Sequence, residues 1–287
     1  EPEKMFFSRL RGLARALPRT LVVGGSAAVV AAASVREAHA EGGPAKPTQW
    51  YMKPWTSYQQ EPTLPELVPG YDRVHVLKRT FYSVSLMGKL RDKETQKGEF
   101  VDAAQKMSHM LFNEALGMLP YTPRTVTTPV DGASYVTFDM PDPKSEVCVV
   151  SILRAATSMA EVVSREYPVM PVGTILIQRD EETAEPKLFF SKLPEDIAVR
   201  RVLLVDPMLA TGGSAKEAIQ VLRQAGVDEQ HIVLVSVVAA PEGIDSVVKH
   251  HPLVRILVGE VDRGLNKKAY IVPGLGDFGD RFYGTTR

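Results

Sequence analysis

The chain has 287 residues, which exceeds a typical single domain and predicts one large domain with an extension. Basic and acidic residues balance at 34 each, so the net charge gives no reason to expect nucleic acid or an anionic membrane surface as a partner. The single cysteine, Cys148, excludes an intramolecular disulfide framework and a multi-cysteine metal site, and its apolar neighbours predict a buried small hydrophobe.

Residues 1–40 combine an arginine-rich stretch with an apolar one. Between Met5 and Thr20 the chain carries four arginines and no acidic residue, which is typical of mitochondrial targeting sequences. The uncharged run from Leu21 to Val35 is shorter than the ~20 residues that comfortably span a bilayer. A presequence, a secretory signal and a retained helix all fit this pattern. Small residues suit close helix packing, so we expect a retained segment at the mitochondrial inner membrane, either as a marginal transmembrane helix or as an arm bound to another protein.

Residues 41–73 form a connector rich in proline and aromatic residues. Its prolines prevent a long helix and favour extended structure. Both tryptophans of the chain, Trp50 and Trp55, lie here. Aromatic residues in an extended segment tend to dock on a protein surface or at a membrane interface. We therefore expect residues 1–73 to bind any partner that is specific to this chain.

Residues 74–287 predict an α/β domain. The predicted helices cover 84–91, 100–119, 161–166 and 244–250, and the predicted strands cover 135–139, 147–152, 172–178, 202–205, 231–239 and 256–261. Strands that alternate with helices predict a mostly parallel central sheet with helices on both faces. Ligands of such sheets bind beyond the carboxyl ends of the strands.

The most informative stretch follows the predicted strand at 202–205. Asp206 ends that strand, and the small residues Thr211-Gly212-Gly213-Ser214 lead into a helical pattern. A glycine-rich loop between a strand and a helix presents backbone N–H groups to an anion and therefore predicts a phosphate site. The Gly-Lys-Ser/Thr of a P-loop and the three spaced glycines of a dinucleotide site are both missing. An ordinary corner with a surface aspartate stays open as the alternative on this stretch alone.

The sequence DPMLATGGS at 206–214 resembles the phosphoribosyl pyrophosphate (PRPP) site of phosphoribosyltransferases, and specifically that of the uracil phosphoribosyltransferase family. The resemblance continues in family order through VSILRA (150–155), QRDEETAEPKLFFSKLP (178–194), AAPEGI (239–244), VDRGLN (261–266) and YIVPGLGDFGDRFYGT (270–285). It implies the type I phosphoribosyltransferase fold, preceded here by an N-terminal extension. It also implies the transfer of ribose 5-phosphate from PRPP to uracil in pyrimidine salvage, with a homodimer as the assembly.

The resemblance implies a role for each matching residue. Asp206 would hold the ribose hydroxyls, the loop at 211–214 would wrap the 5′-phosphate, and backbone groups of the C-terminal loop would bind the edge of uracil. Asp277 would approach the ribose or the Mg²⁺ that enters with PRPP, and no residue is expected to hold the metal on its own. The implied catalytic residues are Asp206, Asp277 and Arg179, and the implied substrate-binding residues are Arg154, Ala155, Ala156, Met208, Ala210, Thr211, Gly212, Gly213, Ser214, Ile271, Gly276 and Phe278.

Four positions depart from the family pattern. Ala156 replaces a glycine in a turn whose backbone amide approaches the pyrophosphate, and its Cβ predicts strain there. Ala160 replaces a glutamate, and Lys106 and His109 replace arginines. Two functions therefore stay open. The one we favour is an active uracil phosphoribosyltransferase associated with an organelle, and the other is a weak or inactive accessory subunit of a mitochondrial membrane complex.

Overall fold

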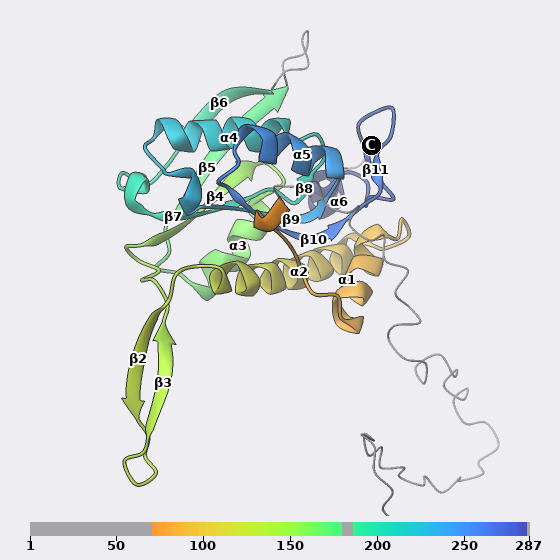
Figure 1. Ribbon diagram of the computed structural model, residues 1–287. Helices are drawn as coiled ribbons and strands as arrows, with labels where there is room; N and C mark the ends of the chain where they lie inside the picture. Colours follow the sequence, from red (N-terminus) through yellow and green to blue (C-terminus); the bar gives the residue numbers. More distant parts are fainter. Residues whose placement is uncertain (1–70, 180–185, 286–287) are drawn as a thin grey trace, which may run out of the picture. The chain divides into compact units, whose positions relative to one another are not determined.

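The computed structural model describes residues 71–179 and 186–285, and the rest of the chain is drawn as a thin grey trace in Figure 1. The expected targeting segment, the expected membrane helix and all but the last residues of the connector lie outside the described residues. Within the described residues, no helix combines the length and the apolar character needed to cross a bilayer.

An eight-stranded sheet forms the centre of the described domain. Its strands are β1 (Val74–Val76), β4 (Val147–Leu153), β5 (Val172–Arg179), β6 (Pro186–Lys192), β7 (Arg201–Val205), β8 (Met208–Leu209), β9 (Ile232–Ala239) and β10 (Arg255–Val261). The strands run in the order β1-β10-β9-β7-β4-β5-β6, and β8 pairs with β9. Every neighbouring pair is parallel except β5 and β6. The predicted mostly parallel sheet is confirmed.

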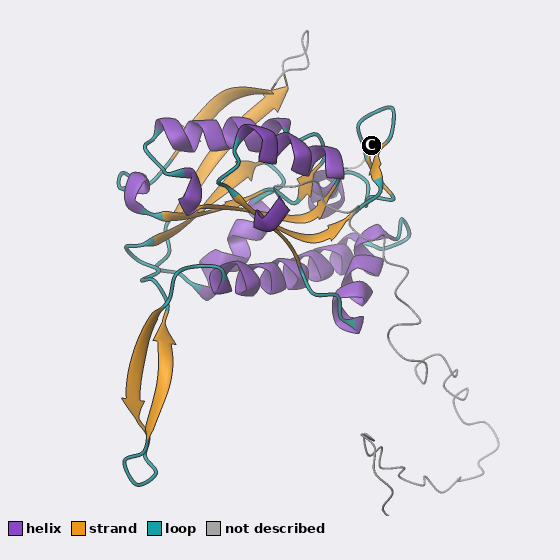
Figure 2. Cartoon of the chain, viewed as in Figure 1, coloured by secondary structure: helices purple, strands orange, loops and turns teal. Residues whose placement is uncertain are grey.

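Helices cover both faces of this sheet, with α1, α2 and α3 on one face and α4 and α5 on the other (Figures 1 and 2). The helices are α1 (Phe81–Arg91), α2 (Lys97–Gly117), α3 (Thr157–Glu166), α4 (Gly213–Gln224), α5 (Pro241–His250) and α6 (Phe278–Tyr283). Short 3₁₀ helices cover Tyr71–Arg73, Ile197–Val199 and Glu229–His231. Two layers of helices explain why the central strands are apolar along their whole length, since neither face of the sheet meets water.

The two faces of the sheet carry separate apolar cores. The α2 core contains Phe100 of α2 and Leu203 of β7, whereas the α4 core contains Ile219 of α4 and Leu204 of β7. Successive residues of a strand point to opposite faces, so neighbouring residues of β7 fall in different cores. Cys148 on β4 is fully buried, as predicted, and this burial raises the pKa of its thiol to about 12.

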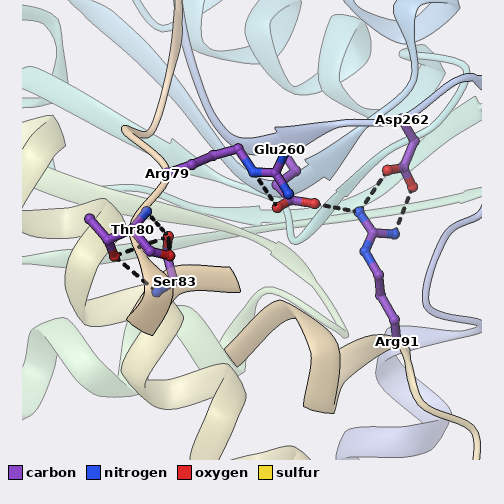
Figure 3. Close-up of polar contacts among 6 residues, drawn as sticks. All are labelled: Arg79, Thr80, Ser83, Arg91, Glu260 and Asp262. Atoms are coloured by element: carbon purple, nitrogen blue, oxygen red, sulfur yellow. Dashed lines mark hydrogen bonds and ion pairs between the residues drawn. The ribbon is translucent and has the colours of Figure 1, made fainter. Parts of the chain in front are cut away.

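The start of α1 that hydrophobic spacing predicted is too late in the chain. The expected start was at 84, but α1 begins at Phe81. Thr80 and Ser83 form a capping box, in which the Thr80 hydroxyl accepts from the Ser83 N–H at 3.1 Å and the Ser83 hydroxyl accepts from the Thr80 N–H at 2.9 Å (Figure 3). These bonds satisfy N–H groups that the first turn of a helix leaves without partners, and an apolar pattern does not register them.

The strand expected at 135–139 exists, but it lies outside the central sheet. The prediction that it belongs to that sheet is therefore wrong. It forms β3 (Ser134–Asp139), which pairs antiparallel with β2 (Thr122–Thr127) in a separate hairpin. Tyr135, Val136 and Phe138 are 63%, 59% and 60% exposed on this hairpin. Exposed apolar side chains that gather on one element are typical of an interface. The homodimer stays a prediction, which the mass of the protein in solution would check.

Candidate functional site

The parallel sheet brings the chemistry-bearing motifs to one edge. Arg154 follows β4 directly and Asp206 follows β7 directly, and β4 and β7 are parallel neighbours. Parallel neighbours end at the same edge of a sheet, so the predicted PRPP-binding groups of the two motifs meet there. The topology agrees with the sequence prediction that ligands bind beyond the carboxyl ends of these strands.

The phosphate loop, which we define as residues 206–214, turns directly into α4. Gly212 has a φ of +77°, in the left-handed region that favours glycine, and a Cβ at this position would lie 2.8 Å from the carbonyl oxygen of Gly243. The N-cap of α4 is Gly212 and its first residue is Gly213. Neither glycine has a side chain that could cover the N-terminus of the helix. The backbone N–H groups and the positive end of the helix dipole are therefore available to an anion.

Helix α5 supports the phosphate loop from its other side. A Cβ added to Gly243 in the first turn of α5 would lie 2.5 Å from the Ala210 carbonyl oxygen and 2.7 Å from the Leu209 carbonyl oxygen. Real side chains do not approach a backbone this closely, so α5 touches the loop only because residue 243 is a glycine. The AAPEGI motif was recognised by resemblance, but its contact with the phosphate loop was not predicted.

Asp206 is the residue of the phosphate loop whose pKa is strongly shifted. Burial raises the pKa of its carboxyl group to about 7, and a long contact of 3.5 Å from the Met208 N–H to Oδ1 lowers this pKa only weakly. A carboxylate with a pKa near neutrality changes its charge within the physiological range. Strong pKa shifts caused by burial at the edge of a sheet are common in functional sites.

Arg154 lies against the C-terminal segment. Its Nη2 donates to Asp280 Oδ1 at 3.1 Å, and its guanidinium lies 5.3 Å from the centre of the Tyr283 ring. The residue predicted to face the pyrophosphate and the loop predicted to bind uracil are therefore neighbours in space. Arg179 is the last residue of β5, and its side chain lies outside the described part of the structure.

The strain expected at Ala156 is absent, which corrects that prediction. Ala156 has φ −70° and ψ −11°, an ordinary right-handed conformation, at the start of α3. It is fully buried in the α2 core, while Ala155 before it is only partly buried against the same core. The Cβ of Ala156 therefore packs among core side chains, and the departure from glycine does not distort the backbone.

The other departures lie away from the strand ends. Lys106 is exposed on α2 and forms an ion pair with Asp102 at 2.7 Å, and His109 contacts Glu166 of α3. Ala160 is 5% exposed and belongs to the α2 core. None of these three residues is brought to the phosphate loop.

The C-terminal motif forms the base loop, which we define as residues 271–278. It begins at β12 (Ile271–Val272), which pairs with β11 (Gly264–Leu265), and it ends where α6 begins. Ile271 and Phe278 are buried, and Phe278 meets Phe100 at 5.4 Å between ring centres. Since the side chains of Ile271 and Phe278 point into the core, these two residues can offer a ligand only their backbone groups. This arrangement agrees with the predicted backbone contacts to uracil, including that of Gly276.

Asp277 already has a structural role at the end of the base loop. Its Oδ1 accepts from the Asp280 N–H at 2.8 Å and so caps α6. The second oxygen of the same exposed carboxylate remains available for the predicted contact with ribose or Mg²⁺. Among residues 71–179 and 186–285, no group of three histidine, cysteine or acidic side chains is placed to hold a metal ion.

A buried ionic cluster beside the base loop was missed by sequence analysis. Arg91, the last residue of α1, bonds Asp262 and Glu260 near the end of β10, and Arg79 lies on the other side of Glu260 (Figure 3). The VDRGLN motif indicated Asp262 as part of a family block. No pattern in the sequence connected it to an arginine 171 positions away.

The fold and these loops define an α/β protein with a candidate phosphate site at the carboxyl edge of a parallel sheet. The family model for uracil phosphoribosyltransferase matches residues 77–285. The chain is 45% identical over 216 residues to a uracil phosphoribosyltransferase of Dictyostelium discoideum, covering 75% of this chain and 97% of that protein. It is 41% identical over 217 residues to the uracil phosphoribosyltransferase of Saccharomyces cerevisiae, covering 74% and 97%.

A solved structure, that of the AQ2163 protein from Aquifex aeolicus, is similar with a TM-score of 0.64 and 31% identity, covering 74% of this chain and 99% of that chain. The chain belongs to the uracil phosphoribosyltransferase family. The family and the fold predicted from the sequence motifs are therefore confirmed.

Proposed function

We propose that this chain is an active uracil phosphoribosyltransferase, which converts uracil and PRPP to uridine monophosphate (UMP) and pyrophosphate in pyrimidine salvage. The observation that carries this proposal is the intact phosphate loop at the end of β7. It combines a position that tolerates only glycine, the uncovered start of α4, and a half-buried Asp206 whose pKa is raised to about 7. Two relatives named uracil phosphoribosyltransferase are 45% and 41% identical to this chain over 216 and 217 residues, which make up about three quarters of its length.

The geometry accounts for the transfer in terms of positioning and charge. The amides of the phosphate loop bind the 5′-phosphate, and the Asp206 carboxylate accepts hydrogen bonds from the ribose hydroxyls. The bond from ribose C1 to uracil N1 then forms as the bond from C1 to the pyrophosphate oxygen breaks, and the proton of uracil N1 passes to water. The electron pair of the broken bond leaves with pyrophosphate, whose negative charge Arg154 would stabilise.

Magnesium enters this scheme as part of the substrate, bound to pyrophosphate oxygens. Mg²⁺ is commonly held by substrate phosphates with one or two protein carboxylates, and keeps several waters. Asp277, at the end of the base loop, would supply one such carboxylate. A dedicated protein cage is not needed for this mode of binding.

The experiment that tests the function is UMP formation from uracil and PRPP, measured on the wild-type chain and on Ala156→Gly side by side. We expect the wild type to be active and the variant to stay within about threefold of it, because the backbone at Ala156 is already unstrained. The variant should be less stable by about 1 kcal/mol, since it loses a buried methyl group. Activity that appears only in the glycine variant would instead support the weak or inactive subunit.

The second candidate is an accessory subunit at the mitochondrial inner membrane, and residues 1–73 favour it. This segment precedes the family match and carries the arginine-rich and apolar stretches described above. Fractionation of cells that make the full chain tests both the location and the assembly. We expect the chain in the inner-membrane fraction, and gentle solubilisation should release it together with a partner. Recovery in the cytosol would contradict the location, and release of the chain alone would contradict the complex.

A further inference from the structure

The base loop is tied to the end of α1 through one arginine. Arg91 Nη1 donates to the carbonyl oxygen of Gly274 at 2.8 Å, and the same guanidinium bonds Asp262 at 2.6 and 2.9 Å and Glu260 at 2.9 Å (Figure 3). Asp262 Oδ2 in turn accepts from the Gly274 N–H at 2.8 Å. A single ion pair therefore holds both backbone groups of Gly274.

Most of the surface of this cluster is withdrawn from water. The side chains of Arg91 and Asp262 are 19% and 4% exposed. Burial alone would lower the pKa of Arg91, but its hydrogen bonds to Asp262 and Glu260 outweigh that effect and raise it, so the guanidinium stays charged. Shielded, bidentate arginine–carboxylate pairs are stronger and better defined than surface ion pairs.

A second arginine, Arg281, also connects the base loop to the turn after α1. Arg281 of α6 donates to the Leu275 carbonyl oxygen at 2.7 Å and to the Asp92 carbonyl oxygen at 2.6 Å. Its guanidinium also lies 4.4 Å from the centre of the Phe100 ring. The base loop and the turn between α1 and α2 are therefore joined at two consecutive positions, 274 and 275.

We propose that Arg91, acting through Asp262, is a positioning residue for the nucleobase. The proposal rests on the proposed function, because it assigns a role within the same site. Gly276 and Phe278 follow Gly274 closely in the chain, so fixing Gly274 fixes the backbone groups that would contact uracil. Backbone recognition depends on such fixed placement, since a shift of about 1 Å at a reacting group costs on the order of 10²-fold in rate.

The proposal predicts a much larger effect on uracil than on PRPP. The phosphate loop is anchored by β7, α4 and α5, whereas Arg91 acts on the base loop through Gly274 and Asp262. Loosening the base loop should therefore weaken uracil binding far more than PRPP binding, which involves this loop only through Asp277, a residue held separately by the Asp280 N–H. A purely structural role would instead lower the melting temperature and alter both substrates alike.

The test compares Arg91→Gln with Arg200→Gln. Arg200 is a matched control because it is 5% exposed and pairs with Asp196 at 2.6 and 2.7 Å. It also donates to the carbonyl oxygens of Lys144 and Val147 near the start of β4, at the edge of the sheet away from the phosphate loop. We expect Arg91→Gln to raise KM for uracil by about tenfold or more, as loss of a hydrogen bond to a charged group does, with KM for PRPP within about twofold. Arg200→Gln should leave both KM values unchanged.

Two further measurements keep the outcome decisive. Arg91→Lys keeps the charge but not the fork, so it should fold and still raise KM for uracil. Binding of UMP and of ribose 5-phosphate, measured by calorimetry, gives the same comparison without turnover, because only UMP carries the base. The gain in affinity from ribose 5-phosphate to UMP should shrink in Arg91→Gln.

The outcomes separate this inference from the proposed function. A wild type that forms no UMP would overturn the proposed function, and the calorimetric comparison would still decide the role of Arg91. An active wild type with unchanged KM for uracil in Arg91→Gln and Arg91→Lys would overturn the inference alone. Equal increases in both KM values would also overturn it, because they would indicate general loosening.

Discussion

Replacing Asp206 with asparagine is expected to lower kcat/KM for PRPP by on the order of 10²-fold, while making the folded chain more stable above neutral pH. The loss follows because hydrogen bonds from ribose hydroxyls to a carboxylate are worth about 1.5–3 kcal/mol each, and an amide accepts them more weakly. Steady-state assays of UMP formation measure the loss, and thermal unfolding measures the gain.

The sign of the stability change follows from the raised pKa. Burial raises the pKa of Asp206 from 3.8 to about 7, so the folded state holds a proton that the unfolded chain releases. Stability therefore falls as pH rises from about 4 to about 7, and the full cost of the buried charge is present above that range. Asparagine carries no charge, so the variant should gain melting temperature at about pH 8 and gain little at about pH 4. An equal gain at both pH values would contradict this account.

The same titration predicts how PRPP binding depends on pH. KM for PRPP should fall as pH rises from about 6 to about 8, because the ionised form of Asp206 is the better hydrogen-bond acceptor. The phosphate of the ligand also titrates near pH 6, with a second pKa of about 6. The asparagine variant provides the baseline for that contribution. A wild type and a variant with the same pH profile would show that Asp206 does not contact the ligand.

Replacing Gly243 with alanine is expected to remove phosphate binding although residue 243 does not itself belong to the phosphate loop. The new Cβ would lie 2.5 Å from the Ala210 carbonyl oxygen and 2.7 Å from the Leu209 carbonyl oxygen, so either α5 or the loop must move. A displacement of about 1 Å at the loop should lower kcat/KM by on the order of 10²-fold or more. The overpacking should also destabilise the fold by about 1–3 kcal/mol.

Gly88→Ala is the matched control for this change. Gly88 also lies in a helix, but a Cβ there meets nothing within 4 Å, so alanine should raise stability by up to about 1 kcal/mol without changing activity. Calorimetric binding of ribose 5-phosphate and denaturant unfolding of the two variants make the comparison. If Gly243→Ala bound ribose 5-phosphate as tightly as the wild type, the support of the loop by α5 would be disproved.

Sequence patterns predicted the phosphate loop because everything that defines it is local. An apolar strand, an acidic residue at its end, two glycines and a helical pattern all fall within residues 201–224, and each has a direct structural meaning. The parallel sheet was predictable for the same reason, since its strands and helices alternate along the chain. Resemblance to a family then connected these motifs to one another.

The contacts that support the site could not be predicted, because they join distant parts of the chain. Arg91 meets Gly274 across 183 positions, and Gly243 meets the phosphate loop through backbone atoms that leave no periodic signature. The hairpin of β2 and β3 shows the same limit, since the sequence predicted the strand at 135–139 but not its partner. At Ala156 the motif raised a concern about strain, but which way a Cβ points depends on the fold around it.

The separation of the two cores has a consequence for how such a protein changes over evolutionary time. The base loop is rooted in the α2 core through Ile271 and Phe278, whereas α4, which follows the phosphate loop, is rooted in the α4 core through Ala218 and Ile219. The central sheet separates these two cores. Substitutions in the α2 core can therefore change which nucleobase a related protein prefers. The α4 core on the other face, and the PRPP site next to it, can stay the same.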